Sequence, residues 1–218
     1  MERKNVINVL DALERLYLQA GPQLKYKSPY ELLVAVILSA QCTDKRVNEV
    51  TKELFKEHNT PERMLRLSRE ELERYIYTCG LYRSKAKHIL SASRDIAERF
   101  GGKVPDTLDG LRSLAGIGRK SANVVYSVAF GGDAIAVDTH VFRVANRIGL
   151  AQSPTPIGTE MQLMEAIPKE RWSRSHHLLI FHGRNICKAQ RPRCGDCPLT
   201  GLCRYYIERA GGAPGQGN

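Results

Sequence analysis

Apolar residues recur at helical spacing along almost the whole 218-residue sequence. One face of a first helix is marked by Val6, Leu10, Leu13, Leu16 and Tyr17. The stretch 30–41 is apolar nearly all round, which predicts a buried central helix. Alternation with a period of two residues is almost absent, and the strand-like stretch 135–137 is too short to found a sheet. We therefore predict an all-α protein of roughly ten helices.

Residues typical of helix ends support this interpretation. Ser68 followed by Glu71 has the spacing of a capping box, and glycines are expected to close the helices predicted over 84–100 and 139–148. The stretch 211–218 is rich in glycine, which predicts a disordered tail.

The charge balance favours a polyanionic partner. Lys and Arg number 33 against 23 Asp and Glu, a net charge of +10, and the stretch 171–209 carries a surplus of six basic residues. The longest apolar run, 32–40, is far too short to span a bilayer, so no membrane association is expected. No export signal is evident, so we expect a cytoplasmic protein in which cysteines serve as metal ligands rather than form disulfides. Nothing in the sequence suggests an oligomer, so we expect a monomer.

A glycine turn between two helical segments, at 114–120, has the sequence Leu-Ala-Gly-Ile-Gly-Arg-Lys. Such a turn matches a helix-hairpin-helix, in which Gly116 and Gly118 let backbone N–H groups approach a phosphate at a helix N-terminus. The alternative is a pair of glycines that only caps a helix. The adjacent Arg119 and Lys120, together with the basic composition, favour DNA binding.

Lys120 and Asp138 together indicate chemistry beyond DNA binding. A helix N-terminus disfavours an ammonium, and a neutral amine can attack a sugar carbon to form a Schiff base. The Asp138 carboxylate could take up a proton or stabilise positive charge on the sugar. Alternatively, Lys120 is a solvated surface charge and Asp138 or Thr139 caps the helix at 139–148. We expect Thr139 to be the cap, because capping by Asp138 would compete with catalysis.

Four cysteines close to the C-terminus, with the spacing C-x6-C-x2-C-x5-C, form a complete four-thiolate ligand set: Cys187, Cys194, Cys197 and Cys203. Zinc and a [4Fe–4S] cluster both accept four thiolates, and the single C-x2-C pair favours iron–sulfur. Between the first two ligands lie Lys188, Arg191 and Arg193, which either form a solvated basic loop or contact DNA phosphates.

The glycine turn with Lys120, the later Val-Asp-Thr-His at 137–140 and the cysteine spacing together resemble the bacterial endonuclease III family. This family comprises DNA glycosylase/AP lyases of the helix-hairpin-helix–Gly/Pro–Asp superfamily, and the resemblance covers about 30–203. It implies a two-lobed helical fold with a barrel-like helical domain at 22–132 and an iron–sulfur domain made of 1–21 and 133–210. Lys120 and Asp138 fall on the catalytic positions, and the four cysteines on the [4Fe–4S] ligands.

The resemblance also implies several DNA contacts. Gln41 would fill the gap left by an extruded nucleotide, and Leu81 would wedge into the opposite strand, offsetting part of the cost of unstacking. Asp44 could line the pocket for the extruded base, and His140 could reach the DNA backbone or simply pack. Ala115 departs from the family's usual proline, which leaves the turn less fixed in φ.

We therefore predict a bifunctional DNA glycosylase/AP lyase that removes oxidised pyrimidines from double-stranded DNA and cleaves 3′ to the abasic site by β-elimination. One alternative is a monofunctional glycosylase, such as an adenine-mismatch enzyme, which activates water and needs no lysine at the hairpin. Another is a non-catalytic helix-hairpin-helix module, which has no use for both Lys120 and Asp138.

Overall fold

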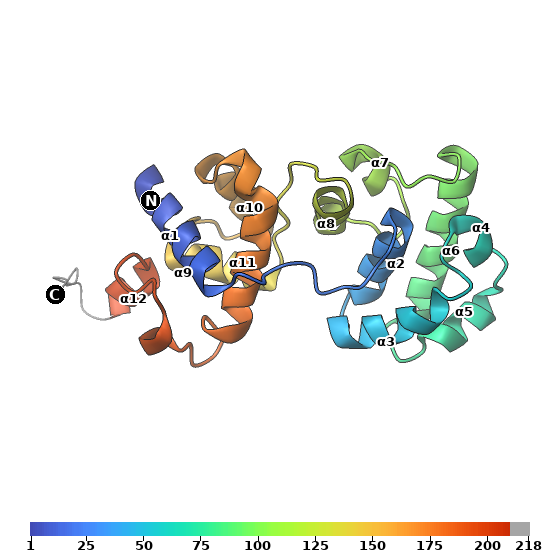
Figure 1. Ribbon diagram of the computed structural model, residues 1–218, viewed down its shortest axis with the longest axis horizontal. Coiled ribbons are helices and arrows are strands. Elements are labelled where there is room, and N and C mark those ends of the chain that lie inside the picture. The colour runs from blue at the N-terminus through green and yellow to red at the C-terminus, as the bar shows by residue number, and fades with distance from the viewer. Residues whose placement is uncertain (210–218) are drawn as a thin grey trace. The chain divides into compact units, whose positions relative to one another are not determined.

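The computed structural model describes residues 1–209, and its secondary structure is entirely helical (Figure 1). No strand occurs in this part of the chain, which confirms the predicted all-α class. The tail predicted at 211–218 lies outside the described residues. The α-helices are α1 (Arg3–Leu16), α2 (Pro29–Ser39), α3 (Asp44–Leu54), α4 (Pro61–Met64), α5 (Arg69–Ile76), α6 (Tyr82–Arg99), α7 (Leu108–Arg112), α8 (Arg119–Ala129), α9 (Thr139–Ile148), α10 (Pro156–Ala166), α11 (Trp172–Asn185) and α12 (Arg204–Arg209). Two short 3₁₀-helices, η1 (Lys169–Arg171) and η2 (Cys194–Asp196), complete the described elements.

The chain forms two compact units. One, called here the central unit, is Pro22–Gly132. The other, called the terminal unit, combines Met1–Gly21 with the chain from Asp133 onward. Each unit has its own hydrophobic core, so each is described by itself.

Helix α2 is the centre of the central unit. Its residues Tyr30 to Leu38 are all buried, and it packs on α8, α3 and α6. Ser28 caps its N-terminus by accepting a hydrogen bond from the backbone of Glu31 at 3.2 Å. The Tyr30 hydroxyl lies 2.6 Å from the Ser93 hydroxyl of α6, which satisfies both polar groups inside the core. The apolar sequence of α2 is therefore explained by burial on every side.

In the terminal unit, α9 and α11 make the most extensive helix pair, and α1 packs along α11. Val6, Leu10 and Leu13 of α1 are fully buried, as their spacing predicts, whereas Leu16 at the last turn of the helix is exposed. Arg171 bonds to both Asp11 and Glu14 of α1 at 2.8 and 2.9 Å, and this pairing holds the N-terminal helix beside the start of α11.

The helix ends follow the sequence signals closely. The capping box of Ser68 and Glu71 is present at the start of α5. Gly149 ends α9 at φ 97°, a conformation that glycine adopts without steric cost. Among the described helices, none has the length and apolar character needed to cross a membrane.

Candidate active site

The helix-hairpin-helix is formed by α7, the turn at 113–118 and α8, and the two helices pack on each other. Leu114 and Ile117 are buried and anchor the turn from within the central unit. Gly116 has φ 80°, and an added Cβ would lie 2.8 Å from the Cβ of His88. Gly118 is the N-cap of α8 and has open space where a Cβ would stand. The turn therefore exposes the first N–H groups of α8, which can donate hydrogen bonds to an anionic oxygen.

Lys120 lies in the first turn of α8, next to this glycine turn, and is exposed. The first turn of α8 holds no acidic residue. An amine placed here can approach a sugar whose phosphate is bound at the turn. The exposed side chain of Lys120 is therefore accessible to a ligand bound at the turn.

Gln41 and Leu81 share an unusual backbone conformation. Both are exposed, with Leu81 at 60% of its full surface, and both adopt left-handed backbone angles, φ 52° and φ 59°. Each such residue costs of order 1–3 kcal/mol, and residues of this kind cluster at functional sites. Their loops also touch, because a Cβ added to Gly80 would lie 3.2 Å from the carbonyl oxygen of Gln41. The structure brings the predicted plug and wedge together on one face of the central unit.

Beneath these two loops lies a polar contact that the sequence did not indicate. Lys85 is 3% exposed, and its Nζ donates a 2.8 Å hydrogen bond to the carbonyl oxygen of Leu38. Burial lowers the pKa of this amine. The thiols of Cys42 and Cys79 hydrogen-bond to each other close by, and burial raises the pKa of Cys79 to about 11. Lys85 therefore ties the end of α2 to α6 under the loops.

Asp44, the predicted pocket residue, is the first residue of α3 and is half-buried. Thr43 caps that helix by accepting from the backbone of Arg46. The carboxylate of Asp44 therefore lies three residues from Gln41, at the start of a helix whose position the cap fixes.

Asp138 occupies the N-cap of α9, where its Oδ1 accepts a 2.8 Å hydrogen bond from the backbone of Val141. Our assignment of this cap to Thr139 is therefore wrong. A cap uses one carboxylate oxygen and leaves the second available, so capping and catalysis need not compete. The helix end fixes the Asp138 side chain in place.

His140 does not extend freely into solvent. Its Nδ1 lies 3.2 Å from Nη2 of Arg143 on the next turn of α9, and burial lowers its pKa. Arg143 in turn donates to the carbonyl oxygens of Cys187 and Gly183 at 3.1 and 3.0 Å. His140 is thus partly packed against the segment that carries the first cysteine.

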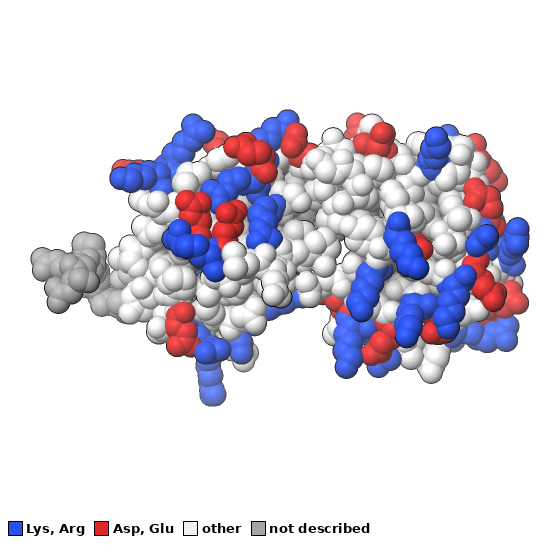
Figure 2. All heavy atoms as spheres, in the orientation of Figure 1, with Lys and Arg blue, Asp and Glu red and all other residues white. Residues whose placement is uncertain are grey.

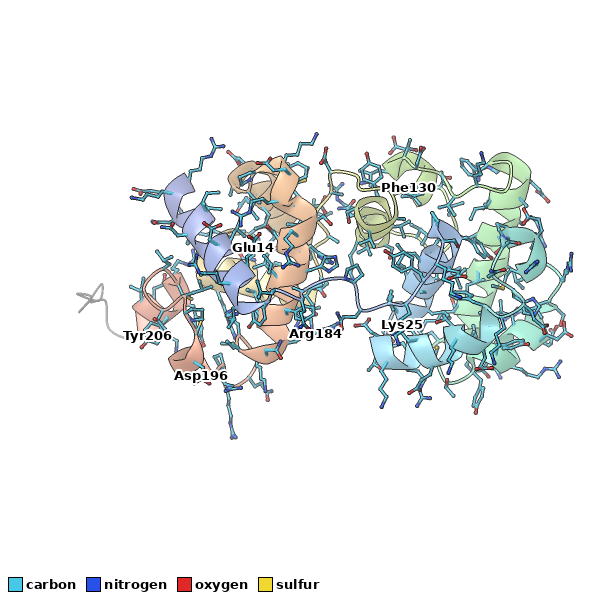
Figure 3. All side chains as sticks on the ribbon, in the orientation of Figure 1. Glu14, Lys25, Phe130, Arg184, Asp196 and Tyr206 are labelled. Carbon is cyan, nitrogen blue, oxygen red and sulfur yellow. The ribbon has the colours of Figure 1, made fainter. Side chains whose placement is uncertain are left out.

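The four cysteines gather in the last part of the terminal unit, between α11 and α12. The labels of Asp196 in η2 and Tyr206 in α12 locate this segment in Figure 3. Burial, together with the charges of the other three cysteines, raises the pKa of the Cys197 thiol to about 11. Four thiolates this close repel one another, so they require a bound cation.

Donors already surround these sulfurs. Backbone groups of Leu199 and of Tyr205 and Tyr206 are hydrogen-bonded to Cys197 and Cys203. Arg147 donates to the Cys187 sulfur at 3.7 Å and, from the same guanidinium, to the carbonyl oxygen of Lys188 at 2.7 Å. Donors aimed at thiolate sulfurs are typical of iron–sulfur sites.

The three basic residues of the predicted loop differ in whether an acidic side chain pairs with them. Lys188 and Arg191 are exposed, and Arg191 adopts a left-handed φ of 47°. Arg193 is paired with Asp196 through Nε at 2.8 Å and Nη2 at 2.6 Å. Elsewhere, Figure 2 shows Lys and Arg gathered over α3 and α5 on the visible face of the central unit. Positive charge is therefore present on both units.

Two buried histidines of α11 were not predicted from the sequence. His176 contacts the backbone just before Asp138, and His182 contacts a cysteine sulfur. A signal was available, since three histidines at 176, 177 and 182 fall in one predicted helix and must find partners when buried.

Comparison with known proteins agrees with this arrangement. The family model described as HhH-GPD superfamily base excision DNA repair protein matches residues 34–169, and the iron–sulfur binding domain of endonuclease III matches 187–203. Endonuclease III of Bacillus subtilis is 51% identical over 94% of both chains. Endonuclease III of Escherichia coli is 43% identical over 94% of this chain and 97% of the relative.

Solved structures give the same result. A trapped endonuclease III–DNA covalent intermediate has a TM-score of 0.91 and 46% identity, and covers 96% of this chain and 99% of that chain. A thermostable thymine-DNA glycosylase has a TM-score of 0.84 at 22% identity, which shows a shared fold.

The predicted class of protein, activity and cofactor are confirmed. The chain is a base excision repair enzyme with DNA glycosylase and AP lyase activity, and its cofactor is a [4Fe–4S] cluster. It therefore belongs to the HhH-GPD superfamily of base excision DNA repair proteins and, within it, to the endonuclease III family.

Proposed function

We propose that this enzyme removes oxidised pyrimidines from double-stranded DNA and cleaves the resulting abasic site as a monomer, with Lys120 as the nucleophile. The observation that carries the proposal is the exposed Lys120 amine in the first turn of α8, directly after the glycine turn. A phosphate bound at that turn would hold a sugar within reach of the amine.

In the first step, the Lys120 nitrogen attacks C1′ of the extruded nucleotide, and the C1′–N bond to the base breaks. The base leaves with that electron pair and takes up a proton. The amine loses its protons to solvent or to Asp138, and the sugar ring opens to a Schiff base. Loss of a C2′ proton then expels the 3′ phosphate by β-elimination. The Asp138 carboxylate stabilises positive charge as the base leaves.

Contacts from several elements hold the DNA. Gly116, Gly118 and Arg119 bind a backbone phosphate at the hairpin, and the loop residues Lys188, Arg191 and Arg193 bind phosphates elsewhere. Gln41 fills the gap left by the extruded nucleotide, and Leu81 wedges into the opposite strand. Support comes from the exposure and left-handed backbone of both. Asp44 lines the base pocket, and His140 lies near the backbone.

The cofactor is held by Cys187, Cys194, Cys197 and Cys203 in this proposal. It supplies a rigid, charged core that fixes the basic loop, and bond breaking is left to the protein side chains. The central unit thus serves as the hairpin domain and the terminal unit as the iron–sulfur domain. The enzyme acts in the cytoplasm, on the nucleoid.

Borohydride trapping tests the nucleophile directly. Abasic-site DNA incubated with the holoenzyme and borohydride should give a covalent adduct, because reduction fixes the Schiff base. Lys120→Gln should abolish the adduct, whereas Lys87→Gln, at an exposed lysine of α6, should leave it unchanged. No adduct with the wild type, or an undiminished adduct with Lys120→Gln, would contradict the mechanism. Release of a free base without strand cleavage would instead indicate a monofunctional glycosylase.

A further inference from the structure

A partly buried hydrogen-bonded chain leads from the N-terminal helix to one of the cysteines. The Tyr17 hydroxyl, at the end of α1, lies 3.2 Å from Nδ1 of His182 on α11. The other ring nitrogen of His182, Nε2, lies 3.6 Å from Sγ of Cys197. His182 is 1% exposed, and its ring packs edge-on against the Tyr17 ring. Both nitrogens of this ring are therefore committed to protein partners.

The proton positions in this chain follow from the chemistry of its end. A cysteine that binds iron is a thiolate, which has no proton and can only accept a hydrogen bond. Nε2 of His182 must then carry the proton and donate. The ring is buried and neutral, so Nδ1 is unprotonated and accepts the proton of the Tyr17 hydroxyl. One direction of donation satisfies every atom, from Tyr17 through His182 to Cys197.

We propose that Tyr17 and His182 are positioning residues for the cluster: they donate a relayed hydrogen bond to the Cys197 ligand and raise the reduction potential of the [4Fe–4S] centre. The inference rests on the ligand assignment made under the proposed function. Donation to a ligand sulfur withdraws electron density from it, which stabilises the more reduced and more negative state of a cluster. The Tyr17 hydroxyl strengthens this effect by holding the His182 ring in one tautomer and one orientation.

The relay also explains why the polar side chains of Tyr17 and His182 pack against each other between α1 and α11. Tyr17 packs on Phe181 and His182, and Arg174 donates to its carbonyl oxygen at 3.1 Å. The end of α1 is thus fixed against α11 from two directions. A purely structural contact would not require His182 to face the sulfur.

The test is the midpoint potential of the cluster in the purified holoenzyme, followed by its visible absorbance during a redox titration. His182→Leu, which removes the donor, should shift the potential to a more negative value. Tyr17→Phe, which keeps the ring and removes only the hydroxyl, should shift it in the same direction by a smaller amount. His182→Gln, whose amide can still donate, should stay closest to the wild type. His177→Leu is the matched control on the same helix, and its potential should be unchanged.

Iron content per chain separates the possible failures. If His182→Leu does not assemble a cluster, Tyr17→Phe and His182→Gln carry the test. Fully loaded Tyr17→Phe and His182→Leu variants with the wild-type potential would overturn the relay, as would an equal shift in His177→Leu. A failure of the ligand assignment shows itself differently, as full iron content and an unchanged cluster spectrum in Cys197→Ser.

Discussion

His176 donates a 2.7 Å hydrogen bond from Nδ1 to the carbonyl oxygen of Ala136, two residues before Asp138. The segment at 134–137 is buried but belongs to no helix or strand, so its backbone groups need partners from elsewhere. His176 is 5% exposed and lies on α11, the helix most closely packed against α9. The chain segment that leads to Asp138, the proposed catalytic carboxylate, is therefore held in place by α11.

Replacing His176 with Leu should destabilise the enzyme and slow catalysis together. A buried carbonyl left without a partner costs about 1–3 kcal/mol, and each kcal/mol lowers the Tm by roughly 2–4 °C in a chain of this size. His176→Asn places an amide donor near the original Nδ1 and should recover part of both losses. Thermal melting and single-turnover base release measure the two effects. Equal behaviour of the Leu and Asn variants would rule out the hydrogen bond as the cause.

Asp138 has two roles that paired substitutions can separate. Asp138→Asn keeps a side chain that caps helices well, so the Tm should remain close to that of the wild type. The loss of the charge should still slow base release by about 10²–10⁴-fold. Asp138→Ala should lose the activity and, in addition, about 1 kcal/mol of helix capping.

Thr139→Ala is the control for this pair, because the cap belongs to Asp138. Its stability should change little. A larger loss of stability from Thr139→Ala than from Asp138→Ala would contradict the observed cap.

These sites show what the sequence can and cannot predict. The hairpin is local: the glycines, the buried Leu114 and the following helix all lie within a few residues, so the pattern alone identifies it. Leu81 is different, because an apolar residue beside a helix is predicted to be buried, and only its left-handed backbone and the contact between Gly80 and Gln41 expose it. His182 depends on a partner 165 residues away in the sequence, Tyr17. Long-range pairing of this kind leaves no local pattern.

The two glycines of the hairpin should respond differently to alanine. Gly116→Ala requires a side chain at φ 80° and a Cβ 2.8 Å from His88, so it should lower both the Tm and DNA affinity. Gly118→Ala meets no atom within 4 Å and has φ −86°, so its Tm should change by only a small amount. A phosphate approaching the Gly118 backbone would contact the new methyl group. Affinity for abasic-site DNA should therefore fall in both variants, and a Gly118→Ala variant with wild-type affinity would exclude close phosphate approach there.

Acid stability should depend on His177. The pKa of His177 is lowered from 6.5 to about 3, mainly by burial and to a smaller extent by the charges of the neighbouring His176 and Arg174. Between these values the unfolded chain binds a proton that the folded chain excludes. The resulting stabilisation of the fold is fully present above pH 6.5 and is lost as the pH falls toward 3. His177→Gln should flatten this part of the pH profile, measured as Tm against pH. His88→Gln should leave it unchanged, and an unaltered slope in His177→Gln would show that other groups cause the acid sensitivity.

The basic loop should contribute unequally to DNA binding. Lys188 and Arg191 are exposed, whereas Arg193 is held by Asp196 and already part-neutralised. Each phosphate contact adds about 0.9 to the slope of log affinity against log salt concentration. Lys188→Gln and Arg191→Gln should each lower that slope by close to this amount, and Arg193→Gln by less. Asp196→Asn frees the Arg193 guanidinium and should raise affinity at low salt. If Asp196→Asn leaves both the affinity and the salt slope unchanged, Arg193 does not contact a DNA phosphate, because a released guanidinium within reach of one would strengthen binding.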